Sequence, residues 1–387
     1  MILARRVARD LIKRNGRRSA ADRASATQSR RRAGAAGGDI EYNRPVRGRC
    51  RPPSPDAARQ LLPPPSPAPS PPDTRSMDAP ISNSPAAPSI RPGSWDAWRV
   101  ALRPKTLWIA TIPVIVATCL AWSVARAFDP AIALIALAAA VLMQVVTNLQ
   151  NDVGYTQRGA ESGRRIGLPR ATANGWLGTR EVRRAIVAAI VIAQLVALPL
   201  MIRGGWPIVL TSAFSTLAAV GYMGGPRPIA YTPFGELAVF VFFGLVAVCG
   251  SYYVQAGSIG LAAWIAAVAI GMHAAAVLLV NNYRDRAHDA ATGRRTLTVV
   301  LSPAAAIRLY AFLLLAPFVL AGSLVPVTGN GWFALPLLTL PWAWRLWGEL
   351  LHTPSGPAQN ALLFRTVMLE VAFGMLLAAG ALLDRWH

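Results

Sequence analysis

Charged residues are scarce in this chain of 387 residues: Asp, Glu, Lys and Arg make up 15% of it, against 53% hydrophobic residues. In soluble domains about a quarter of all residues are charged, so the composition argues against a purely soluble enzyme. Only three cysteines are present, Cys50, Cys119 and Cys249, far apart and without a CxxC spacing. The sequence therefore offers neither a cysteine-based zinc site nor a disulfide framework.

Acidic residues are few, and the net charge of +21 raises nucleic acid as a partner. That excess is shared between residues 1–92 and the rest of the chain, where basic residues fall mostly between apolar runs. Basic loops between apolar runs are typical of membrane proteins rather than of a DNA-binding face. We therefore expect membrane lipid as a partner and no nucleic acid.

Residues 1–92 are rich in Arg, Pro, Ser and Ala and show neither helical nor strand periodicity. Such a segment cannot bury enough apolar surface to fold, so we predict a disordered N-terminal extension. Its basic start is compatible with a transit peptide; we favour a dispensable extension, with Met77 as a plausible true start. No apolar stretch of a secretory signal follows the first charges.

Long apolar stretches of about 20 residues, enough to cross a bilayer, begin at Thr106. They predict an all-α, polytopic membrane domain over residues 93–387, with about nine transmembrane helices around a central cavity. The predicted spans are 106–125, 131–150, 184–202, 206–223, 236–254, 258–280, 304–325, 331–348 and 361–383.

Arginines gather in alternate loops between these spans, whereas the other loops hold Arg126, Arg203 and little else. The positive-inside rule then places the arginine-rich loops and the N-terminus in the cytoplasm. An odd number of spans places His387 outside. We expect an integral protein of a bacterial inner membrane, with its cavity open to the cytoplasmic side.

Two of the arginine-rich loops follow the same polar pattern, Asn-x-x-x-Asp. Asn148 and Asp152 end one predicted span, and Asn281 and Asp285 end another, with Asp289 repeating the spacing one turn later. This spacing puts both side chains of a pair on one helix face. Two such clusters on the same side of the membrane could face each other across the cavity.

Carboxylate and amide oxygens in an incomplete ligand set are typical of Mg²⁺ sites, because Mg²⁺ keeps waters and binds substrate phosphates. The arginines beside both motifs supply positive charge for a diphosphate. For either motif alone, solvated residues at the ends of spans are the alternative. The repeat in spacing and membrane side favours a functional site.

An ordered series of short segments accompanies the two motifs, and it resembles the UbiA superfamily of intramembrane prenyltransferases. Within it, the resemblance is closest to the 1,4-dihydroxy-2-naphthoate prenyltransferases of menaquinone synthesis, and it covers residues 97–387. The segments are Leu102-Arg103-Pro104-Lys105-Thr106-Leu107, Gly221-Tyr222, Gly224-Gly225-Pro226, Pro228-Ile229-Ala230-Tyr231, Gly235-Glu236, Phe242-Phe243-Gly244, Asn281-Asn282-x-Arg284-Asp285 and Gly293-x-Arg295-Thr296-Leu297.

The resemblance implies an enzyme that ionises an allylic polyprenyl diphosphate and alkylates an aromatic acceptor. It implies Asp152, Asp285 and Asp289 as the catalytic residues, holding Mg²⁺ together with Asn148. Candidates for substrate contacts are Lys105, Asn148, Asn151, Arg164, Arg170, Asn282, Arg284, Arg295, Tyr222 and Tyr231, the tyrosines being equally well explained as interface residues.

The favoured reaction is transfer to 1,4-dihydroxy-2-naphthoate with decarboxylation, which gives demethylmenaquinol. Another aromatic acceptor, such as 4-hydroxybenzoate, is the nearest alternative. A transporter or non-catalytic membrane binding protein is the alternative from a different class.

One position departs from the family pattern. The family's first motif usually has a second aspartate three residues after the first, where this chain has Tyr155. Either Asn148, Glu161 or water completes the metal shell, or the chain has changed substrate or lost activity. Two other ionisable residues are interpreted as structural: His273 as a hydrogen-bonded packing histidine, and Glu236 as a helix cap.

Overall fold

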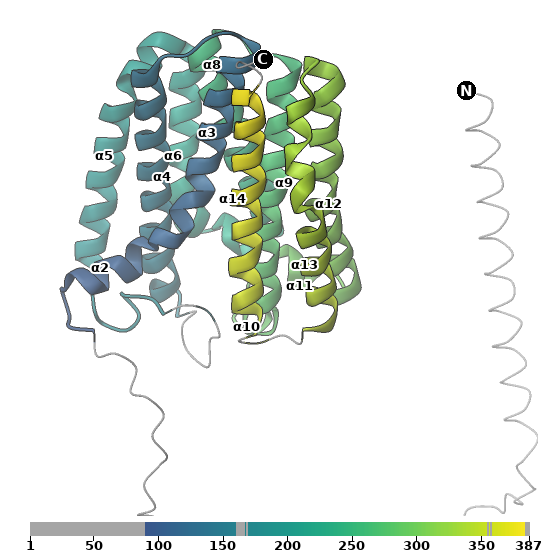
Figure 1. The fold of residues 1–387 in the computed structure, drawn as a ribbon. Coiled ribbons are helices and arrows are strands. Elements are labelled where there is room, and N and C mark those ends of the chain that lie inside the picture. Colours follow the sequence, from purple (N-terminus) through teal and green to yellow (C-terminus); the bar gives the residue numbers. More distant parts are fainter. Residues whose placement is uncertain (1–89, 160–166, 168, 354–355, 357, 384–387) are drawn as a thin grey trace, which may run out of the picture. The chain divides into compact units, whose positions relative to one another are not determined.

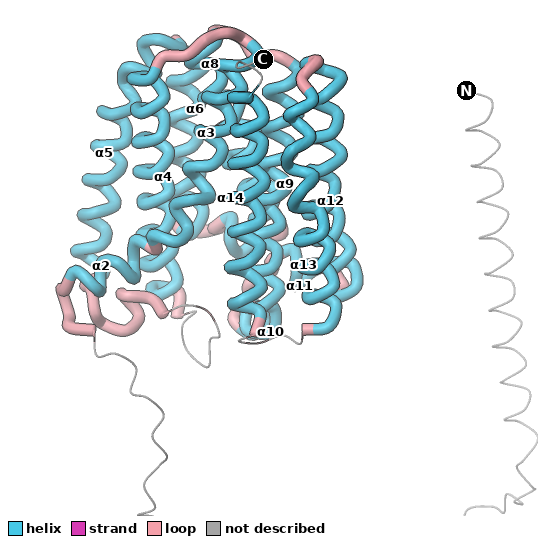
Figure 2. Tube along the Cα trace, in the orientation of Figure 1, coloured by secondary structure: helices cyan, strands magenta, loops and turns pink. Residues whose placement is uncertain are grey.

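The computed structural model describes residues 90–159, 167, 169–353, 356 and 358–383. Most of the predicted N-terminal extension, with Glu161, Arg164 and His387, lies outside these residues. Within the part described, every regular element is a helix and no strand occurs, which confirms the all-α prediction (Figure 2).

The first elements of the described part are α2, Trp95–Leu102, and the 3-10 helix η2, Pro104–Thr106, and its last element is α14, Gln359–Leu383. The elements between are α3 Leu107–Val124, α4 Pro130–Gln157, α5 Thr179–Gly204, α6 Trp206–Met223, η3 Ile229–Tyr231, α7 Gly235–Val239, η4 Phe240–Cys249, α8 Gly250–Ala256, α9 Leu261–Arg284, α10 Arg286–Ala291, α11 Leu297–Val300, α12 Pro303–Thr328, η5 Gly331–Thr339 and α13 Leu340–His352.

Eight helices in the described part of the chain are long and apolar enough to cross a membrane. They match eight of the nine predicted spans. The elements from α2 to α3 together make one of these spans, and those from α7 to α8 make another. The ninth prediction, 331–348, falls on η5 and α13, which start as a 3-10 helix and contain Arg345 and Glu349. Figure 1 shows α14 running from the end of the bundle at which α10 lies to the opposite end, at which α8 lies. Eight crossings would return the chain to its starting end, so η5 with α13 forms the ninth.

Helix starts at two of the loops follow from local sequence. Asp129 accepts hydrogen bonds from the first backbone amides of α4, and Ser302 caps α12 in the same way. Each cap is followed by a proline at the first helical position, Pro130 or Pro303, where the missing N–H costs no hydrogen bond.

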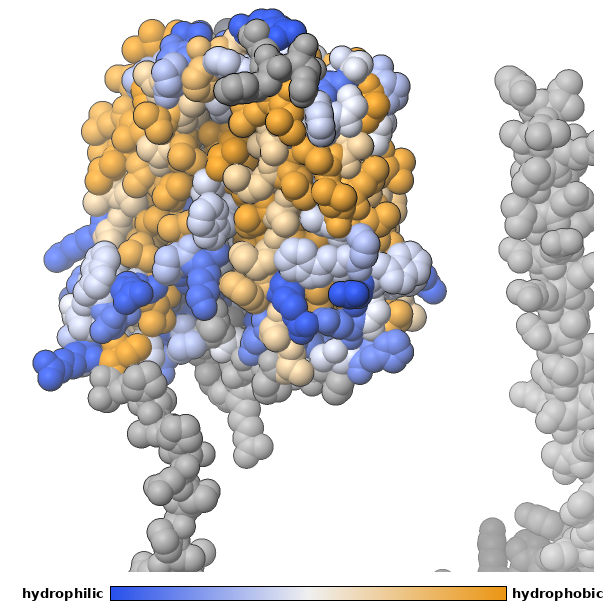
Figure 3. Space-filling view, in the orientation of Figure 1, coloured by the Kyte–Doolittle hydropathy of each residue, from blue (hydrophilic) through white to orange (hydrophobic). Residues whose placement is uncertain are grey.

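The outer surface carries a wide apolar band between two more polar ends (Figure 3). Large exposed side chains of this band come from several helices, including Leu195 on α5, Phe214 on α6 and Val319 on α12. Such a large apolar surface needs a lipid environment. The protein is therefore an integral membrane protein.

Helix α9 is the most buried of the membrane-spanning helices, and η4 packs tightly against it. A Cβ atom added at Gly244 would lie 2.5 Å from the carbonyl oxygen of Ala267 and 2.6 Å from the Cα of Gly271. Glycine is thus required on both helices for this backbone contact. The segment η4 is a π-helix, a form frequent at functional sites, and it also borders the central cavity.

Candidate active site

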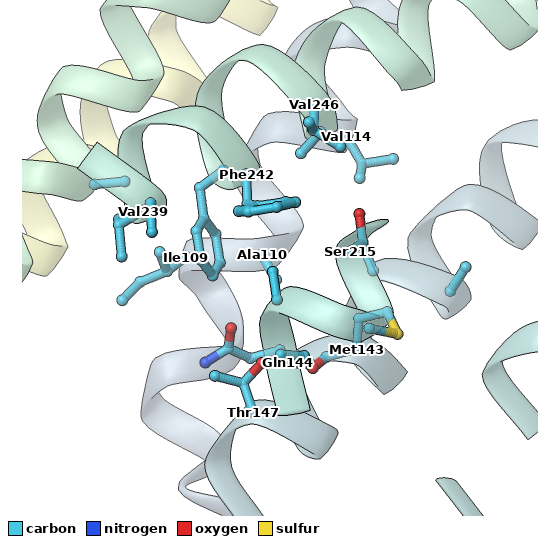
Figure 4. Close-up of a pocket in the computed structure, with 18 of the residues that line it drawn as sticks. Ile109, Ala110, Val114, Met143, Gln144, Thr147, Ser215, Val239, Phe242 and Val246 are labelled. Atoms are coloured by element: carbon cyan, nitrogen blue, oxygen red, sulfur yellow. Dashed lines mark hydrogen bonds between the residues drawn. The ribbon is translucent and has the colours of Figure 1, made fainter. Parts of the chain in front are cut away.

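A cavity of about 390 Å³ lies inside the bundle. Figure 4 shows Ile109 of α3, Gln144 of α4, Ser215 of α6 and Phe242 of η4 around it. The lining residues on α4 run from position 136 to position 151, which is about 20 Å at 1.5 Å per residue. Most of the wall is apolar. The cavity therefore suits a long, apolar ligand with a polar group at one end.

Both predicted motifs reach this cavity at the same end of the bundle. Asn148 and Asn151 of the first motif line it, and so does Asn281 of the second motif, with Arg103 and Thr106 beside them. The first motif ends α4 and the second ends α9, and the chain between them, α5 to α8, closes part of the wall. The structure thus brings together two polar segments that are far apart in the sequence.

In the first motif, the buried carboxylate of Asp152 holds the loop that follows α4. Its Oδ2 accepts a hydrogen bond from the backbone N–H of Ala171 at 3.0 Å. Its Oδ1 accepts from the backbone N–H of Thr172 at 2.8 Å and from the Thr172 hydroxyl at 2.6 Å. Both oxygens of Asp152 therefore accept hydrogen bonds from this loop, one at Oδ2 and two at Oδ1.

Asn148, one turn earlier, ties α4 to the kink between α2 and α3. Its Nδ2 donates to the carbonyl of Leu102 at 2.8 Å and to Oγ1 of Thr106 at 3.1 Å. Its Oδ1 accepts from Nε2 of Gln144 at 3.1 Å. The kink itself is set by Arg103, at φ 52° in the left-handed region, followed by Pro104. Asn148 thus has a positioning role in this structure.

In the second motif, each aspartate pairs with an arginine. Arg284 donates to both oxygens of Asp285, from Nε at 2.9 Å and from Nη2 at 2.7 Å. Arg294 pairs with Oδ1 of Asp289 and also donates to the carbonyl of Ala230. Oδ2 of Asp289 is buried and has no hydrogen-bond partner. Burial raises the pKa of Asp289 from its ordinary value, and the nearby Arg294 acts in the opposite direction.

Tyr155 connects the two motifs. The Cζ atom of Arg170 lies 3.8 Å from the centre of its ring, and that of Arg294 lies 4.9 Å from it. Arg170 belongs to the loop held by Asp152, and Arg294 to the loop after α10. Tyr231 also has arginine neighbours, Arg158 at 5.3 Å and Arg294 at 5.5 Å.

Other predicted residues differ in their positions. Asn282 donates to Oε1 of Glu236 at 2.9 Å, so Glu236, expected only to cap its helix, joins the second motif, and its Oε2 has no hydrogen-bond partner. Tyr222 lines the cavity. Lys105 and Arg295 are exposed and lie outside the buried cluster. Arg164 falls outside the described residues.

Sequence reasoning about the site missed Arg294, a residue that is 3% exposed and contacts Asp289, Ala230 and Tyr155. The adjacent Arg295 was predicted instead. Two consecutive arginines point in different directions, and only the turn after α10 decides which one faces inward. The sequence shows that two arginines are adjacent here, but it does not show which of their side chains faces the site.

His273 confirms its predicted packing role. Its Nε2 lies 3.1 Å from the carbonyl oxygen of Leu314, and its ring packs edge-on against Phe318 and Phe373. It does not line the cavity described above.

Two oxygen atoms at this end of the bundle suit a hard cation. Oδ2 of Asp289 and Oδ1 of Asn151 are both buried and have no hydrogen-bond partner. The residues described contain no group of three or more His, Cys, Asp or Glu side chains that would hold a metal alone. Mg²⁺ commonly takes one or two carboxylates and completes its shell with water and substrate phosphate, so the open oxygens fit it.

The sequence matches the model of the UbiA prenyltransferase family over residues 110–371. It is 35% identical over 297 residues to the 1,4-dihydroxy-2-naphthoate octaprenyltransferase of Escherichia coli (strain K12), covering 75% of this chain and 96% of that protein. The enzyme of the same name from Mycobacterium tuberculosis (strain ATCC 25618 / H37Rv) is 34% identical over 290 residues, covering 75% and 97%.

Solved structures with the same fold include a UbiA homolog from Archaeoglobus fulgidus bound to GPP and Mg²⁺. It has a TM-score of 0.56 and 15% identity, covering 73% of this chain and 99% of that chain. The apo UbiA homolog from Aeropyrum pernix K1 has a TM-score of 0.56 and 19% identity, covering 72% and 98%. At these identities the similarity shows the helical fold alone.

Proposed function

This chain belongs to the UbiA prenyltransferase family, and on that basis we propose that it transfers a polyprenyl group from its diphosphate to 1,4-dihydroxy-2-naphthoate. The C–O bond to the diphosphate breaks, a C–C bond to the ring forms, and the ring carboxylate leaves as carbon dioxide. The product is demethylmenaquinol. As a prenyltransferase of this family the protein is an enzyme that acts on an aromatic acceptor.

The observation that carries the proposal is the meeting of both polar motifs in one apolar cavity. Asn148, Asn151 and Asn281 lie in its wall, and the apolar remainder extends about 20 Å along α4. A polyprenyl diphosphate has the matching shape, an anionic head on a long apolar chain. The head would lie among the motifs and the chain between the helices, where water is excluded and the reactive carbocation is protected from hydrolysis.

The protein's part in the reaction is to stabilise charge. Arg170 and Arg294 provide guanidinium groups, which bind phosphate oxygens through paired N–H donors. The ring face of Tyr222, which lines the cavity, would favour the developing cation, because an aromatic face attracts positive charge. No side chain is required as a covalent nucleophile, so preorganised electrostatics supply the catalysis.

The open carboxylate oxygen of Asp289 supports a divalent-ion site at the second motif, and the open oxygen of Asn151 offers a further donor from the first motif. We propose that Asp289 and Asp285 hold Mg²⁺, Asp285 by exchanging its pairing with Arg284. The ion would add positive charge to the leaving diphosphate. The solved relative from Archaeoglobus fulgidus, bound to GPP and Mg²⁺, supports the same cofactor here.

The acceptor is inferred from the relatives, whose names specify 1,4-dihydroxy-2-naphthoate. We also propose that the end of the bundle with both motifs faces the cytoplasm of a bacterial inner membrane, with the C-terminus outside. The arginine-rich loops at this end support that orientation. Residues 1–92 would form an extension outside the catalytic domain.

The test is an assay of membranes that contain the full-length chain, Mg²⁺ and a polyprenyl diphosphate, with 1,4-dihydroxy-2-naphthoate or 4-hydroxybenzoate as acceptor. Products are identified by mass. We expect a decarboxylated prenyl naphthoquinol that is lost in Asp285→Asn. A prenylated benzoate instead would keep the family chemistry and overturn the acceptor. No product with either acceptor, from folded protein, would overturn the proposed function.

A further inference from the structure

A glutamine lies in the cavity wall next to the first motif. Gln144 of α4 lines the cavity and is 8% exposed. It precedes Asn148 by one helical turn, which is about 6 Å along the axis of α4. Figure 4 shows Gln144 and Thr147 on one side of the cavity, with Ile109 and Phe242 opposite them. Gln144 therefore lies where the polar end of the cavity meets its apolar part.

The neighbours of Gln144 fix the orientation of its amide. The carbonyl of Leu102 can only accept a hydrogen bond, so the Asn148 atom that meets it at 2.8 Å must be the nitrogen, Nδ2. The other amide atom of Asn148, Oδ1, then accepts from Nε2 of Gln144 at 3.1 Å. Gln144 thus uses its donor within the protein. Its acceptor, Oε1, is buried and has no hydrogen-bond partner.

A buried carbonyl oxygen without a donor is unfavourable, so a ligand that brings a donor to Oε1 of Gln144 would be bound selectively. The diphosphate head does not fit this requirement, because ionised phosphate oxygens only accept hydrogen bonds. The prenyl chain has no polar hydrogen at all. A hydroxyl group on the aromatic acceptor has the donor that is needed.

The chemistry of the acceptor indicates which hydroxyl this is. In 1,4-dihydroxy-2-naphthoate, the hydroxyl at ring position 1 lies beside the carboxylate and donates to it. The hydroxyl at position 4 has no acceptor within the molecule and is free to donate to the protein.

The cavity wall also suits an aromatic ring at this level. Phe242 and Ile109 line the cavity and offer aromatic and apolar contacts to a planar ring. A ring held at Gln144 would lie one helical turn from Asn148 and so beside the place proposed for the diphosphate head. The carbon that the ring attacks is bonded to that head, so the position is suitable for the reaction.

We propose that Gln144 recognises the aromatic acceptor, its Oε1 accepting a hydrogen bond from the 4-hydroxyl of the naphthoate. This inference rests on the proposed function for the identity of the acceptor. It assigns the acceptor ring to the part of the cavity between α4 and η4, one turn further from the motif end than Asn148.

The experiment measures the binding of 4-hydroxy-2-naphthoate, 4-methoxy-2-naphthoate and 2-naphthoate to the full-length protein in nanodiscs. Calorimetry is carried out with Mg²⁺ and inorganic diphosphate present, and empty nanodiscs are the blank. We expect wild-type protein to bind the hydroxy compound roughly tenfold more tightly than either of the others, because only its substituent donates a hydrogen bond. In Gln144→Leu this preference should fall to within about twofold.

Two controls separate recognition from a general loosening of the site. Gln144→Leu also removes the donor to Asn148, and a loosened first motif would weaken all three naphthoates alike and weaken inorganic diphosphate as well. Loss of recognition removes only the preference for the hydroxyl. Gln150→Leu, the same substitution on α4 at a residue outside the cavity lining, should keep the full preference.

The inference is overturned if wild-type protein binds none of the three compounds or binds them equally, or if Gln144→Leu keeps the preference. Each of these results is compatible with formation of prenyl naphthoquinol in the product assay, in which case the proposed function would stand. If no prenylated product forms while the preference depends on Gln144, the proposed function fails and the hydroxyl-binding site remains.

Discussion

The two motifs share the spacing Asn-x-x-x-Asp, yet the structure uses them in different ways. At the end of α4, Asp152 is enclosed by backbone amides and anchors a loop. At the end of α9, Asp285 and Asp289 form ion pairs with arginines, and one oxygen of Asp289 stays open. Ion pairs can be exchanged for a ligand, whereas a carboxylate with three backbone and hydroxyl donors is held in place. The repeat in sequence thus covers two different environments: a carboxylate that holds a loop at the first motif, and carboxylates in ion pairs at the second.

Of the substitutions that test this difference between the two motifs, we expect the largest effect on activity at the second motif. Asp289→Asn removes the charge that pairs with Arg294 and the open carboxylate oxygen. We expect at least about a 100-fold loss of kcat, the scale of a lost electrostatic contact in the transition state. Product formation measured by mass spectrometry checks this. The control Asp96→Asn, on an exposed carboxylate of α2, should retain activity.

Asp152→Ala tests the anchoring role at the first motif. The backbone N–H groups of Ala171 and Thr172 would lose their acceptor while buried, which costs roughly 3 kcal/mol of folding free energy. Hydrogen exchange at these two amides should become faster, and the melting temperature should fall. Asp152→Asn, which keeps one acceptor oxygen, should lose less. Unchanged exchange and stability with abolished activity would instead identify Asp152 as a ligand.

Substitutions of the adjacent Arg294 and Arg295 compare a buried arginine with an exposed one. Arg294→Lys keeps the charge but loses the planar contacts with Asp289, Ala230 and Tyr155, so we expect about a tenfold lower kcat/KM. Arg295→Lys should change kcat/KM less than about twofold, as is usual for an exposed side chain. Equal losses in both variants would contradict the orientation described here.

The smallest effect is expected at the kink that Asn148 holds. Thr106→Val removes one of the two acceptors of its Nδ2 while the carbonyl of Leu102 remains. The expected loss of stability is about 0.5–1 kcal/mol, measured by chemical denaturation in detergent. Thr111→Val is the matched control, because the Thr111 hydroxyl bonds only to its own helix at Leu107. A larger loss at Thr111 than at Thr106 would show that the kink contact carries no stability.

Much of the architecture could be predicted from the sequence. Apolar runs long enough for a bilayer predicted eight helices correctly, because hydropathy alone separates lipid-facing segments from loops. The predicted span 331–348 corresponds to η5 and α13, but hydropathy did not predict their form: the segment begins as a 3-10 helix, and α13 contains Arg345 and Glu349. Packing against α12 and α14 holds it in the bundle.

For the candidate site, the sequence determined which residue types gather at one end of the bundle, because span length and loop charge fix the side of the membrane on which each motif emerges. It also marked Tyr155 as unusual. Only the tertiary structure decided that Arg294 rather than Arg295 faces inward, that Asp152 is enclosed by the loop at Ala171 and Thr172, and that Tyr155 joins both loops through two guanidinium groups. These contacts join residues 15 to 139 positions apart. Local spacing carries no information on which partner a side chain meets across a cavity.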